Sequence, residues 1–133
     1  MTAGATAEVT GMEHVQLIDQ YIAAWNETDP ELRRELIART WTKDGSYLDP
    51  LMSGEGHDGI DTMIGGVLSQ FPGLRFRRTS ELDSHNDRVR FSWELGPESG
   101  APLAGGVDFG VIADGRLQAI TGFLDFAPGA NGQ

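Results

Sequence analysis

Three side chains in this sequence have the chemistry to transfer protons, and the first of them is a carboxyl between two glycines. Asp108 stands between Gly106 and Gly110 in an apolar segment that is predicted to be a strand. Residues two apart in a strand share a face, so the two glycines are expected either to give the Asp108 face open volume or to let another group approach it closely. Alternatively, the glycines are bulge or bend positions that curve the sheet, and Asp108 is solvated.

The other two are a tyrosine and a second aspartate. Tyr21 belongs to an apolar helical stripe, so its hydroxyl must find a partner inside the protein or reach water. Asp49 precedes Pro50 at the end of a short predicted strand. Taken singly, Tyr21 is also typical core material, and Asp49 is typical of a turn or cap. A functional role for either one depends on what lies near it.

Three helices are predicted to position these residues. Apolar residues recur every three or four positions over His14–Trp25, which predicts the first helix. Asp29 and Pro30 predict the N-cap and first position of the second helix. Asp58 is expected to cap the third, after a loop over Met52–His57. In the second helix, three basic residues are expected to face water: Arg33, Arg34 and Arg39.

After Gly73 the hydrophobic period changes from 3.6 to 2, which predicts strands joined by turns. The predicted strands are Gly45–Asp49, Leu74–Leu82, Arg88–Leu95, Leu103–Ala113 and Arg116–Phe126. Gly122, on the last strand, is expected to widen the volume beside Asp108. Helices segregated from an antiparallel sheet define an α+β fold.

Composition excludes several classes of protein. The chain has 133 residues, 39% of them hydrophobic, which is enough for one core. Its net charge of -10 repels nucleic acid and anionic membranes. Without cysteine, a disulfide, a thiolate zinc site and a cysteine nucleophile are all impossible. No signal peptide or membrane span is apparent, so a cytoplasmic protein is expected. We predict an N-terminal tail over residues 1–11, one domain over 12–126 and a C-terminal tail over 127–133.

The segments Gln20–Ala24, Tyr47–Pro50 and Gly106–Phe109, in this order of elements, resemble the NTF2-like superfamily, particularly its ketosteroid isomerase and SnoaL-like branches. The likeness in layout covers residues 12–126. It implies three N-terminal helices packed against a curved antiparallel sheet, in a cone that encloses an apolar pocket. It also implies a homodimer formed through the sheet.

The resemblance assigns roles to the three residues. Tyr21 matches the hydrogen-bonding tyrosine of ketosteroid isomerase, Asp49 its general base and Asp108 its carboxylic acid donor. In such a site the base removes a proton next to a carbonyl, and two neutral donors stabilise the enolate oxygen. Apolar surroundings keep the donor acid protonated, an effect for which ketosteroid isomerase is itself the standard example.

The resemblance also has departures. A further tyrosine of ketosteroid isomerases on the third helix is replaced here by the turn Ile64–Val67, and the final-strand aspartate of limonene epoxide hydrolases falls at Gly122. SnoaL-like polyketide cyclases place acid and base residues in the same pocket. The residues expected to line the pocket and bind ligand are Trp25, Val67, Phe71, Phe91, Trp93, Gly106, Gly110 and Gly122.

Two functions follow from this reading. The first is a cofactor-independent enzyme, with no metal, that acts on a small apolar carbonyl compound by proton abstraction, isomerisation or cyclisation. The second is a non-catalytic small-molecule-binding or dimerisation module built on the same pocket. The acidic residues near His57 and His85 are better explained by helix capping and by a hydrated turn than by metal binding.

Overall fold

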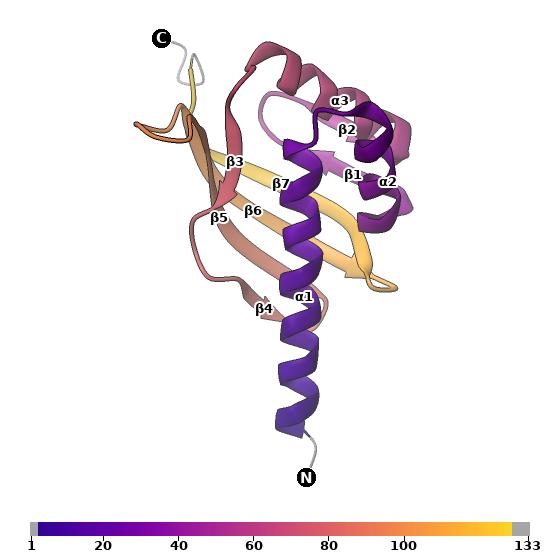
Figure 1. Ribbon diagram of the computed structural model, residues 1–133. Helices are drawn as coiled ribbons and strands as arrows, with labels where there is room; N and C mark the ends of the chain where they lie inside the picture. The colour runs from indigo at the N-terminus through magenta and orange to yellow at the C-terminus, as the bar shows by residue number, and fades with distance from the viewer. Residues whose placement is uncertain (1–2, 129–133) are drawn as a thin grey trace.

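A computed structural model describes residues 3–128, and side chains from Gly11 to Pro128. In this range three helices cover one side of a mixed sheet (Figure 1). The helices are α1 (Ala3–Asn26), α2 (Pro30–Thr40) and α3 (Gly56–Gln70). The strands are β1 (Trp41–Leu48), β2 (Ser53–Glu55), β3 (Arg75–Arg78), β4 (Asp83–His85), β5 (Arg88–Gly96), β6 (Ala104–Ala113) and β7 (Arg116–Phe126). The α+β class is therefore confirmed, although β1 and β2 separate α3 from the first two helices.

The strand order is β2-β1-β7-β6-β5-β3, with β4 also paired to β5. Strands β5, β6 and β7 form the predicted antiparallel meander. Strand β1, however, runs parallel to β7, so the prediction of an antiparallel sheet is wrong in this one pairing. The chain returns from β1 through α3 and the other strands before it reaches β7, and this long connection permits parallel alignment.

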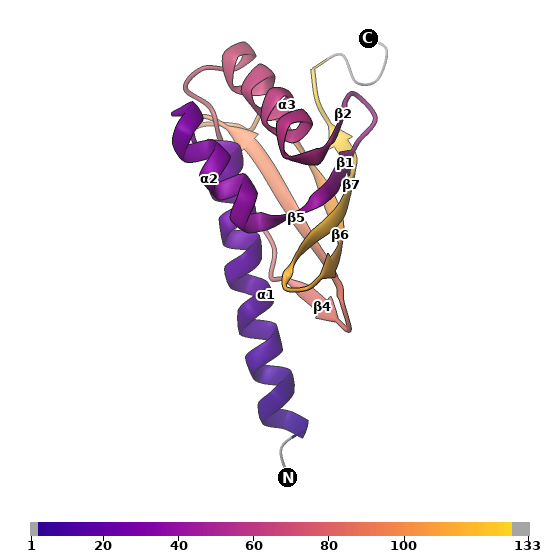
Figure 2. The ribbon, with the colours of Figure 1, turned by 90° about the vertical axis from the view of Figure 1, so that its right-hand side faces the viewer.

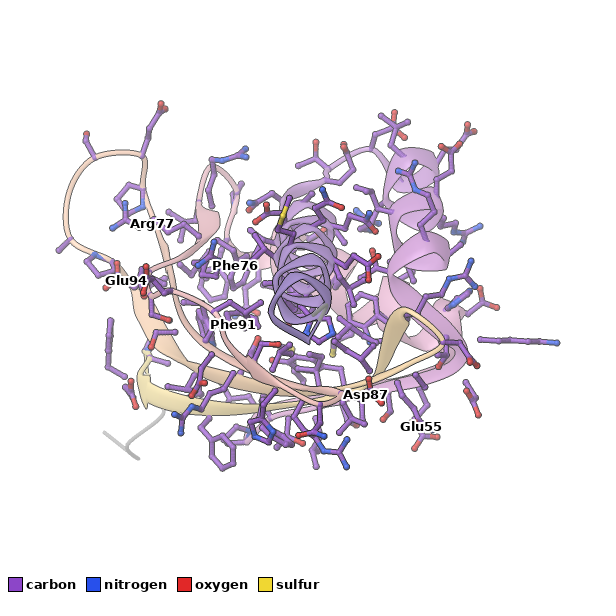
Figure 3. All side chains as sticks on the ribbon, turned by 90° about the horizontal axis from the view of Figure 1, so that it is seen from below. Glu55, Phe76, Arg77, Asp87, Phe91 and Glu94 are labelled. Carbon is purple, nitrogen blue, oxygen red and sulfur yellow. The ribbon has the colours of Figure 1, made fainter. Side chains whose placement is uncertain are left out.

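Helix α1 crosses the concave side of the sheet, and α2 and α3 continue this helical layer (Figure 2). Seen along α1, side chains fill the space between the helix and the curved sheet, with Phe91 and Phe76 among them (Figure 3). Buried residues of the sheet, such as Phe91, Leu117 and Ile120, join Ile18 and Tyr21 of α1 in one core. This packing fixes α1 directly over β5 and β6, where Asp108 is located.

Some element boundaries differ from the prediction. Helix α1 begins at Ala3, so the tail predicted over residues 1–11 is corrected to helix from Ala3 onward, because a weakly apolar stretch can continue a helix that is anchored further along. Residues 129–133 of the predicted C-terminal tail lie outside the described residues. The predicted loop before α3 contains β2, which pairs with β1.

The cap of α2 is confirmed, and that of α3 is not. The Asp29 carboxylate accepts from the backbone N–H groups of Glu31 and Leu32, at 2.9 and 3.4 Å. Helix α3 instead begins at Gly56, with Glu55 in the N-cap position and no side-chain cap. Asp58 therefore lies inside the first turn, where its charge favours the helix dipole but its side chain is not the cap.

The prediction that Arg33 faces water is also wrong, because Arg33 is buried. Its Nε donates to Asp61 Oδ1 at 2.7 Å, and its Nη1 donates to the Glu27 carbonyl at 3.0 Å. Asp61 also accepts from Arg34, at 3.3 Å. This ion pair joins α2 to α3, and so holds α3 in the position from which it forms one wall of a pocket. None of the described helices is both long and apolar enough to cross a membrane.

Candidate acid–base site in a pocket of the sheet

A pocket of about 960 Å³ lies between α1, α3 and the concave side of the sheet. Its walls are largely apolar, with Trp25, Phe71, Phe76, Leu95 and Leu124 among the lining residues. The volume is in the range of pockets that hold small molecules. The pocket is partly open to solvent and partly enclosed by these elements.

Asp108 and Tyr21 meet at the inner end of this pocket. Asp108 is on β6 and Tyr21 is on α1, and the Tyr21 hydroxyl donates to Asp108 Oδ2 at 2.6 Å. Both residues are almost completely buried, with 3% and 1% of their surfaces exposed. The other carboxyl oxygen, Oδ1, is buried without a hydrogen-bond partner among the described residues. The helical stripe of α1 and the alternation of β6 thus bring together two of the three predicted residues.

Burial raises the pKa of the Asp108 carboxyl from 3.8 to about 7. The hydrogen bond from Tyr21 and the neighbouring Trp93 indole act in the opposite direction because they stabilise the anion, whereas the nearby charge of Asp49 raises the pKa further. The pKa of the Tyr21 phenol is also raised well above its usual value, chiefly by burial and then by Asp108. Asp108 is therefore a carboxyl that holds its proton close to neutral pH.

Asp49 follows β1 and is held by a turn and by a phenol. Its Oδ1 accepts from the backbone N–H groups of Leu51 and Met52, at 2.8 and 3.0 Å, which is the turn role considered for an isolated Asp-Pro. Its Oδ2 accepts from the Tyr47 hydroxyl at 2.6 Å. A carboxylate offers about four lone-pair directions, so these three donors fix the group and leave one direction open.

Gly122 of β7 lies between the two carboxyls, and the missing side chain lets both of them and the Tyr47 hydroxyl approach closely. A Cβ at this position would lie 3.0 Å from Asp108 Oδ1, 3.1 Å from the Tyr47 hydroxyl and 3.2 Å from Asp49 Cβ. All three groups therefore border the same small space. Gly122 thus allows close approach of these groups and is outside the pocket lining, so the predicted widening of the volume is corrected to close packing.

The other predicted pocket residues divide into two groups. Trp25, Val67, Phe71 and Trp93 line the pocket. Phe91 does not, because it packs in the core against Tyr21 at a ring distance of 5.8 Å. Gly106, Gly110 and Gly122 are also outside the pocket lining.

Gly106 and Gly110 have packing roles, and of the alternative interpretation only the irregularity at Gly106 is found, because Asp108 is buried and not solvated. A Cβ at Gly106 would come within 1.9 Å of the Phe123 carbonyl oxygen, next to a shift in the register of β6 and β7. At Gly110 it would come within 2.9 Å of Val89 and Ile120 side-chain atoms. These glycines allow close approach of neighbouring groups and do not open the pocket.

Tyr47 is the residue of the site that sequence reasoning missed. It is 4% exposed, and burial together with the nearby Asp108 and Asp49 charges raises the pKa of its phenol far above the usual value. The sequence feature that could have identified Tyr47 is its spacing from Asp49. The two residues are two apart and therefore share a face at the end of β1. Within residues 3–128 there is no cluster of three or more His, Asp or Glu side chains arranged to hold a metal ion.

Comparison with known proteins agrees with the fold. The SnoaL-like domain family matches residues 18–120. The chain also resembles a solved structure from Agrobacterium tumefaciens, a SnoaL-like family protein provisionally named an isomerase. The two are 41% identical with a TM-score of 0.81, over 86% of this chain and 99% of that one. The chain therefore belongs to the SnoaL-like family, within the NTF2-like fold that the sequence resemblance had indicated.

More distant structures share the fold alone. A provisionally named ketosteroid isomerase from Kribbella flavida is 19% identical with a TM-score of 0.66, over 87% of this chain and 80% of that one. A provisionally named SnoaL-like polyketide cyclase from Jannaschia sp. CCS1 is 18% identical with a TM-score of 0.64, over 84% and 86%. A search of curated protein sequences finds no match to this chain.

Proposed function

We propose that this protein is a cofactor-independent acid–base enzyme that removes a proton next to the carbonyl group of a small, largely apolar compound. The supporting observation is the pair of carboxyls across Gly122, in an apolar pocket, one fixed by a turn and the other with a pKa of about 7. Two carboxyls in different environments can take opposite roles in proton transfer. The provisional isomerase and cyclase names of the related structures are consistent with this class of reaction.

In the proposed reaction Asp49 is the base. Its Oδ2 accepts the proton from the carbon next to the carbonyl, and the electron pair moves onto the carbonyl oxygen to form an enolate. Tyr47 keeps this carboxylate in one orientation through the bond to Oδ2, and is a positioning residue in this scheme. Return of the proton to a second carbon completes an isomerisation, and attack of the enolate carbon on a second carbonyl would give a cyclisation.

Asp108 is the proposed donor to the enolate oxygen. The single proton of Tyr21 is directed at Asp108 Oδ2, so a protonated Asp108 carries its own proton on the unpartnered Oδ1. That proton would face the carbonyl oxygen of a ligand in the pocket. Tyr21 then supports the donor by holding the carboxyl in place, and the raised pKa keeps Asp108 protonated at the pH where Asp49 must be ionised.

The test is proton exchange on a bicyclic ketone. Wild type is expected to accelerate the exchange of the C1 protons of 2-tetralone with D₂O, followed by NMR. Asp49→Asn is expected to lower this rate by about 100-fold or more, which is typical for loss of a general base. The variant retains an oxygen that can accept from the Leu51 and Met52 N–H groups, so the turn is preserved.

Binding of 2-naphthol to the same variant, measured by calorimetry, serves as the control for an intact pocket. Equal exchange rates for wild type and variant would contradict Asp49 as the base. Absence of any acceleration by wild type, with naphthol still bound, would instead favour the non-catalytic binding module.

We further propose that the chain forms a homodimer through the outer side of its sheet. Leu48, Phe109 and Phe123 are 58%, 38% and 58% exposed. The register places them together, because Leu48 and Phe109 both pair with Thr121, while Phe123 is two residues along β7 from Thr121. A group of large exposed apolar side chains on one face is typical of an interface between subunits.

A further inference from the structure

Both phenol protons at the inner end of the pocket are already used in hydrogen bonds within the protein. The Tyr21 hydroxyl donates to Asp108 Oδ2, and the Tyr47 hydroxyl donates to Asp49 Oδ2, each at 2.6 Å. A phenol has a single proton, so neither tyrosine has a second one to give to a ligand. Preorganised donors aimed at the oxygen stabilise an enolate, and Asp108 supplies one of them. A second donor to that oxygen would have to be a group other than these tyrosines.

Three indole N–H groups are buried without a hydrogen-bond partner in the described part of the chain. They belong to Trp25, Trp41 and Trp93. An indole N–H can only donate, and a buried donor without a partner is unfavourable. Trp25 and Trp93 line the pocket, whereas Trp41 is completely buried outside the pocket lining. A ligand oxygen in the pocket can therefore satisfy Trp25 or Trp93, but not Trp41.

Trp93 is the indole beside the Asp108 carboxyl. Phe91 of β5 is in register with Asp108 of β6, and Trp93 is two residues further along β5. Trp93 and Asp108 are therefore diagonal neighbours on the inner face, about 7–8 Å apart at the backbone, a separation that a long aromatic side chain can span. Burial raises the pKa of the Asp108 carboxyl, and the neighbouring Trp93 indole acts against this increase. The indole N–H and the unpartnered Asp108 Oδ1 thus belong to the same end of the pocket.

Trp25 lies beside a different group. It is one turn along α1 from Tyr21, and the two rings are 6.5 Å apart. Burial raises the pKa of the Tyr21 phenol, and the Trp25 indole acts against this increase. Phe76 lies between the two indoles, with ring distances of 4.9 Å to Trp25 and 5.7 Å to Trp93. Trp25 is therefore the pocket indole next to the phenol, and Trp93 is the one next to the carboxyl.

We infer that the indole N–H of Trp93 is the second donor to the enolate oxygen, which accepts from both Asp108 Oδ1 and Trp93 Nε1. Tyr21 is then a positioning residue that acts through Asp108. The indole keeps its proton throughout and acts only as a hydrogen-bond donor. This inference rests on the proposed function for the reaction, whereas the hydrogen bond to a ligand oxygen is a property of binding alone.

Two ligands with the same pair of rings measure this hydrogen bond. The carbonyl oxygen of 2-tetralone can only accept, and tetralin has the same rings without an oxygen. Their affinities are measured by calorimetry at pH 6, below the pKa of about 7 of Asp108. Trp93→Phe keeps an aromatic ring and removes the N–H, so it is expected to lower the affinity for 2-tetralone relative to tetralin by about five- to tenfold, the effect of one hydrogen bond.

Trp25→Phe and Trp41→Phe are the matched comparisons, because each also removes a buried indole N–H without a partner. Trp25→Phe should weaken both ligands together through lost ring contact in the pocket, so that the ratio of their affinities stays within about twofold. Trp41→Phe should also leave this ratio unchanged, since Trp41 is outside the pocket lining. An equal change of the ratio in all three variants would overturn the specific role of Trp93.

The rate of 2-tetralone proton exchange gives a second measurement. Trp93→Phe is expected to lower kcat by about 100-fold, as for the loss of one donor to an oxyanion. The loss in kcat should exceed the rise in KM, because the oxygen carries more negative charge in the transition state than in the bound ketone. An unchanged kcat in a wild type that does catalyse exchange would overturn the inference.

An NMR measurement on wild type serves if Trp93→Phe does not fold. In protein labelled with ¹⁵N at the indole nitrogens, 2-tetralone should move the Trp93 N–H proton resonance downfield, and tetralin should not. The resonances missing from Trp25→Phe and Trp41→Phe leave that of Trp93 identified by elimination. An equal response to both ligands, or failure of 2-tetralone to bind, would overturn the inference. Absence of proton exchange by wild type, with the Trp93 resonance still shifted, would instead contradict the proposed function and leave the hydrogen bond established.

Discussion

The two faces of strands β6 and β7 differ in the side chains that they carry and in how far those side chains are buried. On the inner face, Asp108 is a carboxyl placed among aromatic rings and almost completely buried. On the outer face, Phe109 and Phe123 are aromatic rings placed in solvent. Neither arrangement is favourable for the stability of an isolated chain, because one buries a polar group and the other exposes an apolar surface. The difference is what the two proposals require, in which the inner face binds a small molecule and the outer face a second subunit.

The largest effect is expected on the inner face, where Asp108 should make the free energy of unfolding depend on pH. The native pKa of Asp108, about 7, lies above the 3.8 of the unfolded chain, so the native state holds this proton more tightly. The resulting stabilisation is fully present below about pH 4 and is lost as the pH rises to about 7. For a shift of this size it is about 4 kcal/mol.

The measurement is urea unfolding of wild type and Asp108→Asn at several pH values between 4 and 7.5. The free energy of unfolding of wild type should fall by about 4 kcal/mol more than that of the variant over this range. Asp125→Asn is the control, because Asp125 is exposed. Parallel pH profiles for wild type and Asp108→Asn would mean that the carboxyl is not a buried acid.

A smaller effect is expected from substitutions at two adjacent positions of β7, one on the inner face of the sheet and one on the outer face. Gly122→Ala places a Cβ within 3.0 to 3.2 Å of Asp108, Tyr47 and Asp49, which must shift by a few tenths of an ångström. We expect about a tenfold loss in the rate of 2-tetralone exchange, because proton transfer depends steeply on the placement of the groups. Thr121→Ala changes the outer face next to it and should leave the rate within about twofold. Equal losses in both variants would contradict a specific role for the space at Gly122.

The smallest effect on the folded monomer is expected on the outer face. Phe123→Glu should change the free energy of unfolding of the monomer by no more than about 0.5 kcal/mol, because the ring is 58% exposed. It should nevertheless dissociate a homodimer formed through this face, since it buries an unpaired charge in the interface. Light scattering after size exclusion gives the mass of each species. A monomeric wild type, or a variant that remains dimeric, would rule out this interface.

Much of the local structure could be predicted from the sequence. The apolar stripe of α1, the Asp29 cap of α2 and the alternation along β6 each depend on residues close together in the chain. For the same reason, Asp108 could be assigned to the side of β6 opposite Phe109. The resemblance of three short segments then indicated Tyr21, Asp49 and Asp108 as a group.

What the sequence could not provide depends on contacts between distant segments. Arg33 has a helical spacing compatible with exposure, and only the approach of Asp61 from α3 makes its burial favourable. The packing roles of Gly106 and Gly110 depend on how closely β7 and its side chains approach β6. These approaches are set by register and sheet curvature, which no local pattern encodes.

By itself, the sequence determined that there are three helices followed by a meander of strands, and which face of β6 carries the acid, because these properties follow from the periodicity of neighbouring residues. Only the tertiary structure decided that Tyr21 meets Asp108, that Gly122 lets the two carboxyls approach each other, and that the sheet is mixed. Those features require segments far apart in the chain to meet at defined distances, and that is a result of packing around α1.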